Sequence, residues 1–271
     1  MRLDTSTLEN WNTLICEAIS NVADDSFPQR LETALRALVD FDICMVFAYS
    51  QAEDSSALYH NLESNAARVV IDDYLAGPYL LDPFYGAVIE GKKTGFGAMR
   101  ALAPDHFTRS EFYRHHYVRT GIADEMGLFF PVSEGKTAVL SVTRQKPKRI
   151  FTEAERRLFT SAAPVVETFA SSHWNQSERK SGLSKNQVSI EGLFDNFGTG
   201  VVTAREREII ALILKGHSSI SIGHVLGISS GTVKIHRKNA YDKLQISSQA
   251  ELFALFLSTL EKHLSEQPLI L

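Results

Sequence analysis

The sequence predicts an α+β chain of two domains, in which a mixed sheet packed with helices is followed by a domain made only of helices. The 271 residues are too many for one typical small domain. Apolar residues (44%) and charged residues (22%) occur in ordinary globular proportions. Helix and strand patterns alternate in the first part of the chain, and only helical patterns follow. The stretch 175–199 has linker composition, so we expect domains at 1–174 and 200–271 with a linker at 175–199.

Each element of the first domain is predicted from its apolar period and its boundary residues. Helices are expected at 8–22, 28–38, 66–75, a short stretch opened by Asp82-Pro83, 109–119 and 151–173. Strands are expected at 43–49, 57–62, 125–132 and 137–143. Ser133-Glu134-Gly135-Lys136 joins the last two strands as a hairpin, and Thr152 with Glu155 forms a capping box at the start of the last helix.

The same sequence argues against several classes of protein. Cys16 and Cys44 are too few for a disulfide framework or a structural zinc site. The longest apolar run, 43–49, is too short to span a membrane, and residues 1–10 do not resemble a signal peptide. We therefore expect a cytoplasmic protein with no membrane partner.

Motifs of enzymes and of cofactor sites are missing. The chain has no glycine-rich phosphate loop after a strand and no GxSxG. Glu111 and His115 lie four apart on a predicted helix, but neither HExxH nor a second ligand pair accompanies them, so a polar helix face is the better interpretation. We expect no catalytic residue, no metal and no cofactor.

The C-terminal domain differs from the rest of the chain in charge and in pattern. Residues 198–271 hold eight Lys and Arg against six Asp and Glu, whereas the remaining residues hold 20 against 26. Helices are expected at 204–215, from Ser218 or Ser219 to 226, at 231–244 and from 248 to about 263. The middle two are joined by a tight turn at Gly227, which is typical of a helix-turn-helix.

The helix 231–244 carries a basic face suited to DNA. On a helical wheel, the core face consists of Val233, His236, Ala240 and Leu244. The opposite face consists of Lys234, Ile235, Lys238 and Asn239. Lysine can reach guanine or phosphate in the major groove, and Ile235 can touch a thymine methyl. Arg237 and Lys243 flank this face and are expected to reach phosphates, although an ordinary solvated helix is the alternative.

The stretch 202–248 resembles the LuxR-type helix-turn-helix domain. The family pattern LTxREREVL, a glycine, and then xxLxISxxTVKxHxxNIxxKL is matched in order and spacing by Glu206, Gly216, Leu226, Ile228, Ser229, Thr232, Val233, Lys234, His236, Asn239, Lys243 and Leu244. The resemblance implies binding to double-stranded DNA, with Thr232 among the contacts. Val202 and Ala240 depart from the pattern, and 219–223 replaces the usual Asn-Lys-Glu-Ile-Ala and so loses a charged pair.

The first domain resembles acyl-homoserine-lactone receptor domains. Tyr74 and Tyr79 precede Asp82-Pro83 as in the YxxxDP region of that family, and 111–144 and 151–169 resemble its last strands and closing helix. The resemblance implies an α-β-α sandwich of the GAF/PAS kind with a ligand cavity between sheet and helices. It also implies that Asp82 accepts a hydrogen bond from a ligand amide.

The remaining ligand-binding residues also follow from this resemblance. Tyr74 and Tyr79 would line the pocket, Ser141 would add a hydrogen bond, and Phe129 stands where a small polar residue often helps to bind the acyl chain. The two pocket tryptophans of the family are replaced here by Val69-Val70 and Phe96-Gly97. The ligand is therefore either an acyl-homoserine lactone or a different small molecule, and plain helix capping is the alternative role for Asp82.

The leading hypothesis is a one-component transcriptional regulator whose first domain senses a small organic signal and controls operator binding. A second hypothesis is a ligand-independent regulator whose first domain dimerises or binds a protein. A third is an enzyme fused to a DNA-binding domain.

The last predicted helix carries more apolar residues than one core stripe needs. Phe253 and Leu257, four apart, are left over and are expected to be exposed in a monomer. The LuxR-type resemblance implies that this helix pairs with its copy. We therefore expect a homodimer on an inverted-repeat operator whose half-sites lie about one helical turn apart.

Overall fold

The computed structural model describes residues 5–51, 55–63, 67–181 and 197–265, and divides the chain into two compact units. The first unit comprises Met1–Ala67, Ala87–Leu102 and Gly121–Val188. The second comprises Arg68–Gly86, Ala103–Thr120 and Ser189–Leu271. The α+β class predicted from the sequence is confirmed, since the first unit holds a sheet and the described elements of the second unit are helical. The expectation of a mixed sheet is wrong, because every strand pair is antiparallel.

The sheet of the first unit has five antiparallel strands in the order β2-β1-β5-β4-β3. The strands are β1 (Ile43–Ser50), β2 (Ser56–His60), β3 (Gly95–Ala98), β4 (Ile122–Ser133) and β5 (Lys136–Gln145). β4 and β5 form the hairpin that the sequence predicted, with Ser133 paired to Lys136, and β2 pairs with β1 as expected. The edge strand β3 was not predicted, because Gly95-Phe96-Gly97 has neither a β-branched residue nor a clear alternation.

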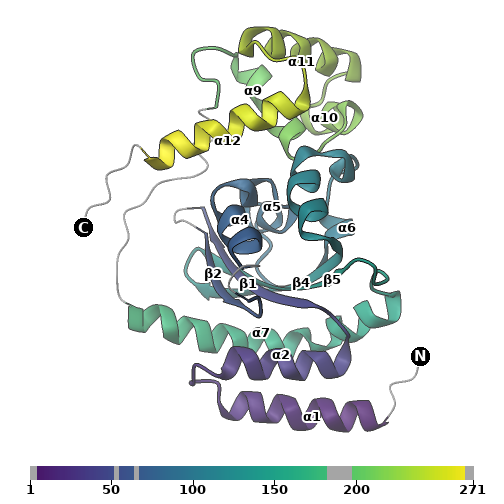
Figure 1. Ribbon diagram of the computed structural model, residues 1–271, viewed down its shortest axis with the longest axis vertical. Helices are drawn as coiled ribbons and strands as arrows, with labels where there is room; N and C mark the ends of the chain where they lie inside the picture. The colour runs from purple at the N-terminus through teal and green to yellow at the C-terminus, as the bar shows by residue number, and fades with distance from the viewer. Residues whose placement is uncertain (1–4, 52–54, 64–66, 182–196, 266–271) are drawn as a thin grey trace. The chain divides into compact units, whose positions relative to one another are not determined.

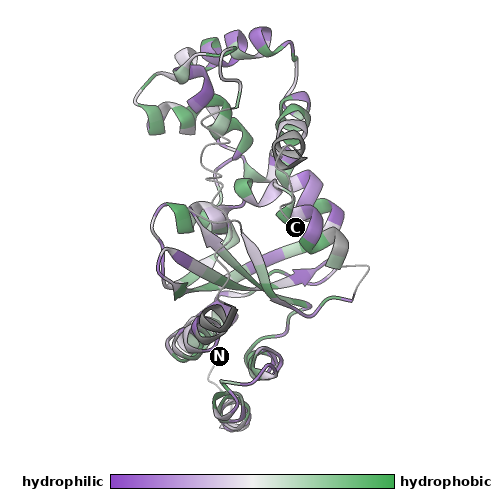
Figure 2. Ribbon diagram, turned by 90° about the vertical axis from the view of Figure 1, so that its left-hand side faces the viewer, coloured by the Kyte–Doolittle hydropathy of each residue, from purple (hydrophilic) through white to green (hydrophobic). Residues whose placement is uncertain are grey.

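Three long helices lie on one side of this sheet (Figures 1 and 2). They are α1 (Thr5–Ser20), α2 (Phe27–Leu38) and α7 (Glu153–Ser181). The helix α1 is packed on α2 and lies farthest from the strands (Figures 1 and 2). Leu128, Phe130 and Leu140 point from the sheet into a core shared with these helices, where Phe27 and Phe159 are fully buried. Burial of this apolar surface is the main stabilising contribution to the unit.

The alternation of side chains along each strand identifies the residues on the opposite face of the sheet. Neighbours along each strand point to opposite sides, so Met45, Phe47, Phe129 and Ser141 lie on the face away from that core. All four are buried.

The helix α7 begins as the sequence predicted and extends further. Thr152 Oγ1 accepts a hydrogen bond from Glu155 N at 3.2 Å, and Glu155 Oε2 accepts one from Thr152 N at 2.7 Å, which completes the capping box. The helix continues to Ser181, into the segment expected to be linker. The remaining linker residues 182–196 lie outside the described part.

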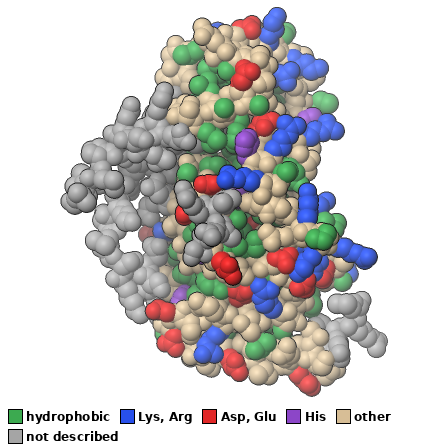
Figure 3. Space-filling view, in the orientation of Figure 1, with side chains coloured by type: hydrophobic (Ala, Val, Ile, Leu, Met, Phe, Trp, Pro, Cys, Tyr) green, Lys and Arg blue, Asp and Glu red, His purple; other side chains and the backbone are tan. Residues whose placement is uncertain are grey.

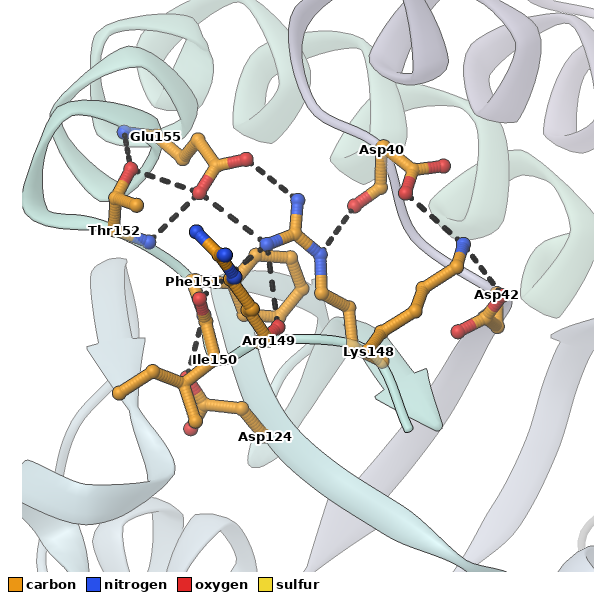
Figure 4. Close-up of polar contacts among 10 residues, drawn as sticks. Asp40, Asp42, Asp124, Lys148, Arg149, Ile150, Phe151, Thr152 and Glu155 are labelled. Atoms are coloured by element: carbon orange, nitrogen blue, oxygen red, sulfur yellow. Dashed lines mark hydrogen bonds and ion pairs between the residues drawn. The ribbon is translucent and has the colours of Figure 1, made fainter. Parts of the chain in front are cut away.

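A polar network fixes the end of β5 against the start of α7 (Figure 4). Arg144 pairs with Glu155 and also donates to the backbone oxygen of Asp40 at 2.8 Å. Its side chain is only 8% exposed, and its guanidinium lies over the ring of Phe151. Burial by itself would raise the pKa of Glu155, but the hydrogen bonds from Arg144 and Thr152 outweigh it and lower that pKa.

The second unit brings short helices of the first predicted domain together with the C-terminal helices. Its short helices are η1 (Arg68–Asp72), α4 (Asp73–Leu75), η2 (Pro78–Leu81), η3 (Phe107–Arg109) and η4 (Tyr113–Val118). Its longer helices are α9 (Ala204–Leu214), α10 (Ser219–Leu226), α11 (Ser230–Leu244) and α12 (Gln249–Ser265). Two further short helices, α5 (Pro83–Ile89) and α6 (Met99–Leu102), complete the chain.

Two segments predicted to be α-helical contain π-helical turns instead. These are η1, within the predicted helix 66–75, and η4, within the predicted helix 109–119. A π-helical turn needs one more residue than an α-helical turn, a feature that the apolar period of a short segment does not reveal. Within the described residues, no helix is long and apolar enough to cross a membrane.

The network in Figure 4 leads to a stability prediction. Arg144→Leu leaves the carboxylate of Glu155 without its partner in a half-buried site, so we expect a loss of about 3 kcal/mol in the free energy of unfolding, measured by urea denaturation. Lys148→Leu is the matched control, because Lys148 pairs with Asp40 and Asp42 near solvent and should cost less than about 1 kcal/mol. Equal losses in the two variants would contradict the assignment of Arg144 as the buried anchor.

Candidate functional site

The helices α10 and α11 form a helix-turn-helix with well-satisfied ends. The Ser218 side chain accepts from Ser221 N at the start of α10, and the Ser229 side chain accepts from Thr232 N at the start of α11. Between them, Gly227 takes a left-handed conformation with φ of 64°. A Cβ at Gly223 would lie 2.7 Å from the Ile228 oxygen, so glycine at this position lets α10 approach the turn closely. The sequence shows this only as a departure from the usual alanine.

The helix α11 exposes the face that the sequence assigned to DNA. Val233 and Ala240 are fully buried, as expected for the core face, while His236 and Leu244 are half-buried. On the other side the exposed residues are Lys234, Ile235, Arg237, Lys238 and Asn239. Ile235 is 62% exposed, so the centre of this face carries an apolar side chain. Lys and Arg side chains are visible at the top right of Figure 3, over this part of the chain.

Two of the expected DNA contacts are engaged within the domain. The Thr232 hydroxyl lies 2.8 Å from the Ser229 hydroxyl at the helix start. The Lys243 ammonium donates to both carboxylate oxygens of Glu206, at 2.9 and 2.7 Å. Lys243 therefore holds α11 against α9, a role that spacing alone did not indicate, and its contact with phosphate stays a prediction.

Glu206 is the buried centre of this arrangement. It also completes the capping box of α9, accepting from Thr203 N at 2.8 Å. Burial by itself would raise the pKa of Glu206, but the hydrogen bonds from Lys243 and Thr203 outweigh it and lower that pKa. The carboxylate is thus charged and paired at neutral pH, and it fixes the position of α11.

Asp82 lies at the centre of the sensor residues in the second unit. Its Oδ2 accepts from the Tyr74 hydroxyl at 3.0 Å, and its Oδ1 accepts from Phe84 N at 2.7 Å, so it caps α5 and binds Tyr74 at once. Tyr79 is buried beside them, with its ring centre 6.1 Å from that of Tyr74. Burial raises the pKa of Asp82 to about 6. The structure therefore brings together three of the five expected ligand-binding residues.

The other two, Phe129 and Ser141, belong to the sheet of the first unit. Phe129 is fully buried on β4, and a Cβ at Gly97 would lie 2.8 Å from its ring. The glycine that stands near the second family tryptophan thus makes room for Phe129, a correlation between two strands that one sequence does not display. The Lys92 ammonium lies 5.0 Å from the centre of the same ring.

The expectation that Phe253 is exposed is wrong for this chain. Phe253 is 2% exposed, because its ring stacks on His115 at 5.1 Å between ring centres, with an angle of 18° between the rings. Leu257 is half-buried. The error arose because the helical wheel counted only the core of the C-terminal domain and could not include the helix 113–118 within the same unit.

Glu111 and His115, which lie four apart, have contacts within their own segment. Arg114 Nη1 donates to Glu111 at 2.7 Å, and His115 Nε2 lies 3.9 Å from the other carboxylate oxygen. Over the described ranges, no group of three or more His, Cys, Asp or Glu is arranged to hold a metal ion.

Comparison with known proteins identifies a family profile and several relatives of this chain. The profile of bacterial regulatory proteins of the luxR family matches residues 201–256. A putative HTH-type transcriptional regulator in the exeN 3' region of Aeromonas salmonicida is 33% identical over 187 residues, which cover 66% of this chain and 94% of that protein. The monoamine regulon transcriptional regulator of Klebsiella aerogenes is 24% identical over 196 residues, covering 72% and 74%.

A solved structure shares the fold of the first part. The VqsR LBD domain from Pseudomonas aeruginosa superposes with a TM-score of 0.53 at 20% identity, covering 60% of this chain and 97% of that one. This likeness concerns the fold.

The raised pKa of Asp82 predicts a pH dependence of stability. A carboxyl group whose pKa is higher in the folded than in the unfolded chain destabilises the fold as pH rises between the two values, here from about 4 to about 6. Asp82→Asn keeps an oxygen for capping but does not ionise, so the difference in unfolding free energy between variant and parent should change by roughly 3 kcal/mol over this window. Urea denaturation at several pH values tests this, and parallel pH profiles would contradict it.

Proposed function

Because the chain belongs to the luxR family of bacterial regulatory proteins, it is a transcriptional regulator and not an enzyme, and we propose that it is a one-component switch. Its N-terminal part senses a small organic molecule, and its C-terminal helices bind an operator under the control of that signal. The exposed basic face of α11 is the single observation that carries the DNA-binding half of this proposal.

Binding of α11 in the major groove fits the chemistry of its exposed face. Lys234 and Lys238 project together and can pair with guanine edges, while Asn239 can donate to and accept from adenine. Ile235 gives the face an apolar centre that fits a thymine methyl group. Arg237, Lys243 and Thr232 lie at its margins, where contacts to phosphate position the helix without reading sequence.

The sensing half of the proposal rests on the buried Asp82. A carboxylate with a pKa near 6 is mostly ionised at neutral pH, and an ionised carboxylate in a buried site favours a donor such as a ligand amide. We propose that Asp82 anchors the ligand, that Tyr74 and Tyr79 contact it, and that Phe129 and Ser141 add an apolar and a hydroxyl contact. This ligand is an acyl-homoserine lactone or another molecule with an amide-like donor. The second choice stays open because the chain lacks the two tryptophans that hold a lactone in the family it resembles.

We propose a homodimer in the cytoplasm as the active form on DNA. Two copies of α11 related by a two-fold axis match an inverted repeat with half-sites about one turn apart. Phe253 and Leu257 on α12 remain the proposed contacts between the C-terminal domains. Since Phe253 is stacked on His115 in this structure, pairing of two α12 helices through Phe253 requires that this stacking be released.

The DNA-binding face is tested by removing one lysine at a time. Lys234→Ala and Lys238→Ala should each weaken binding to the operator by about 1–3 kcal/mol in a fluorescence-anisotropy titration at fixed salt, because each loses a base or phosphate contact. Lys146→Ala is the matched control, since it removes the same charge from an exposed lysine of the first domain. Affinity and sequence preference unchanged by both α11 variants would show that this face does not contact DNA.

The sensing proposal is tested by separating ligand binding from helix capping. Asp82→Ala should abolish the response of a reporter gene to inducer, while Asp82→Asn should keep part of it, because asparagine still accepts a hydrogen bond. Thr152→Ala removes a cap of α7 at a cost of about 1 kcal/mol and should leave the response intact. If Asp82→Ala lowered stability as Thr152→Ala does and still responded to inducer, Asp82 would be a cap only, as expected of a ligand-independent interaction domain.

A further inference from the structure

A cavity of about 270 Å³ lies within the second unit, beside α12. Its walls come from three segments, namely residues 73–78, residues 112–119 and α12 itself. The lining residues that matter here are Tyr74, Phe112, His116, Arg119, Phe253 and Leu257. We call this space the α12 cavity. Its volume is near the lower end of the range for small-molecule sites, which begins at roughly 300 Å³.

Five of the ten residues that line the α12 cavity carry flat rings. The imidazole of His116 stacks on Phe112 with 5.6 Å between ring centres and 8° between planes, and it lies 5.1 Å from the ring of Tyr74. Phe253 and His115, which are stacked on each other, contribute two further rings, and Leu257 adds aliphatic surface. Rings of this kind favour a planar aromatic occupant, because stacked and edge-to-face contacts add to the burial of apolar area.

His116 supplies a polar group inside this aromatic surface. Burial lowers the pKa of His116 to about 4, so the ring is neutral at physiological pH and offers one N–H donor and one nitrogen acceptor. Among the residues that the structure describes, neither ring nitrogen of His116 has a hydrogen-bond partner. The neighbouring Tyr74 hydroxyl is bound to Asp82 instead. His116 is half-buried, so a ligand that covers its ring stabilises the complex only if it also forms a hydrogen bond with that ring.

The charged residues of the α12 cavity are paired with each other. Arg119 Nη1 lies 3.1 Å from Asp73 Oδ2, and both side chains are about half exposed, so this pair lies toward solvent. Among the described lining residues, Asp73 and Arg119 thus leave no unpaired charge to compensate a buried ion, and an uncharged ligand avoids that desolvation cost.

We propose that the α12 cavity is a binding site for a small, uncharged, planar aromatic molecule whose one polar group forms a hydrogen bond with His116. This site differs from the one anchored by Asp82, although Tyr74 contributes its hydroxyl to Asp82 and its ring to the α12 cavity. A molecule bound there contacts α12 together with residues 73–78 and 112–119. It therefore stabilises the arrangement in which these three segments are packed together.

The test uses the full chain with two matched probes. 2-Naphthol is planar, uncharged and carries one hydroxyl, whereas 2-naphthoate has the same rings with a negative charge. Saturation-transfer NMR titrations should show saturable binding of 2-naphthol and at least about tenfold weaker binding of 2-naphthoate, equivalent to about 1.4 kcal/mol. The melting temperature of the protein should rise more with 2-naphthol than with 2-naphthoate at equal concentration.

Three variants assign the binding to the α12 cavity. Leu257→Trp places a larger side chain on a wall of the cavity and should abolish 2-naphthol binding. His116→Phe keeps a ring but removes both nitrogens, and should weaken 2-naphthol about fivefold. Val118→Ala, on the exposed side of the same segment, should change nothing.

Circular dichroism of each variant checks that it folds. If Leu257→Trp is not folded, the His116→Phe comparison decides. Absence of 2-naphthol binding to the parent chain, or unchanged binding in the folded cavity variants, would overturn the site. Equal binding of 2-naphthoate would overturn the uncharged ligand class.

Discussion

The buried carboxylate of Glu206 makes the contact on which the position of α11, and so of the proposed DNA-binding face, depends. It closes the capping box of α9 through Thr203, it is buried, and it holds the ammonium of Lys243 at the far end of α11. A recognition helix can present Lys234, Ile235 and Lys238 to a groove only if its own axis is fixed against the rest of the domain. Glu206 is buried while the Lys243 side chain is 40% exposed, so removing Lys243 would leave a buried carboxylate with only its contacts to Thr203. The contact between the two side chains therefore ties α11 to α9.

Asp82 also has two roles, since its carboxylate caps the start of α5 and accepts a hydrogen bond from Tyr74. Its two oxygens are used by Phe84 N and by the Tyr74 hydroxyl, so any ligand donor must share an oxygen with one of them. This makes the site sensitive to small changes in the position of Tyr74. Within the second unit, Tyr74 in turn contacts the ring of His116, and the preceding residue in the chain, His115, stacks on Phe253 of α12.

The sequence predicted those parts of the fold that depend on local pattern. Thr152 with Glu155, and Thr203 with Glu206, are capping boxes that can be recognised from spacing alone, and the hairpin at Glu134-Gly135 follows from its turn residues. The alternation of buried and exposed positions on α11 likewise follows from the helical period.

The features that were missed depend on contacts between distant segments. On the edge strand β3, Gly97 leaves room for the ring of Phe129, and Phe253 is covered because His115 reaches it from another part of the chain. Lys243 was assigned to phosphate because it flanks the basic face of its helix. Its pairing with Glu206 was missed because nothing in that helix shows that Glu206 lies within reach. In each case, residues between 32 and 138 positions apart in the chain meet, and neither helical nor strand periodicity contains that information.

Selection of binding sites from a pool of random DNA duplexes by the full chain is the most direct test of the central claim, that α11 reads DNA as part of a symmetric dimer. The account predicts enrichment of an inverted repeat whose half-sites lie about one helical turn, roughly 10 base pairs, apart, and the loss of that enrichment in a Lys234→Ala, Lys238→Ala double variant. Enrichment of no sequence, or of a single half-site or a direct repeat, would contradict it.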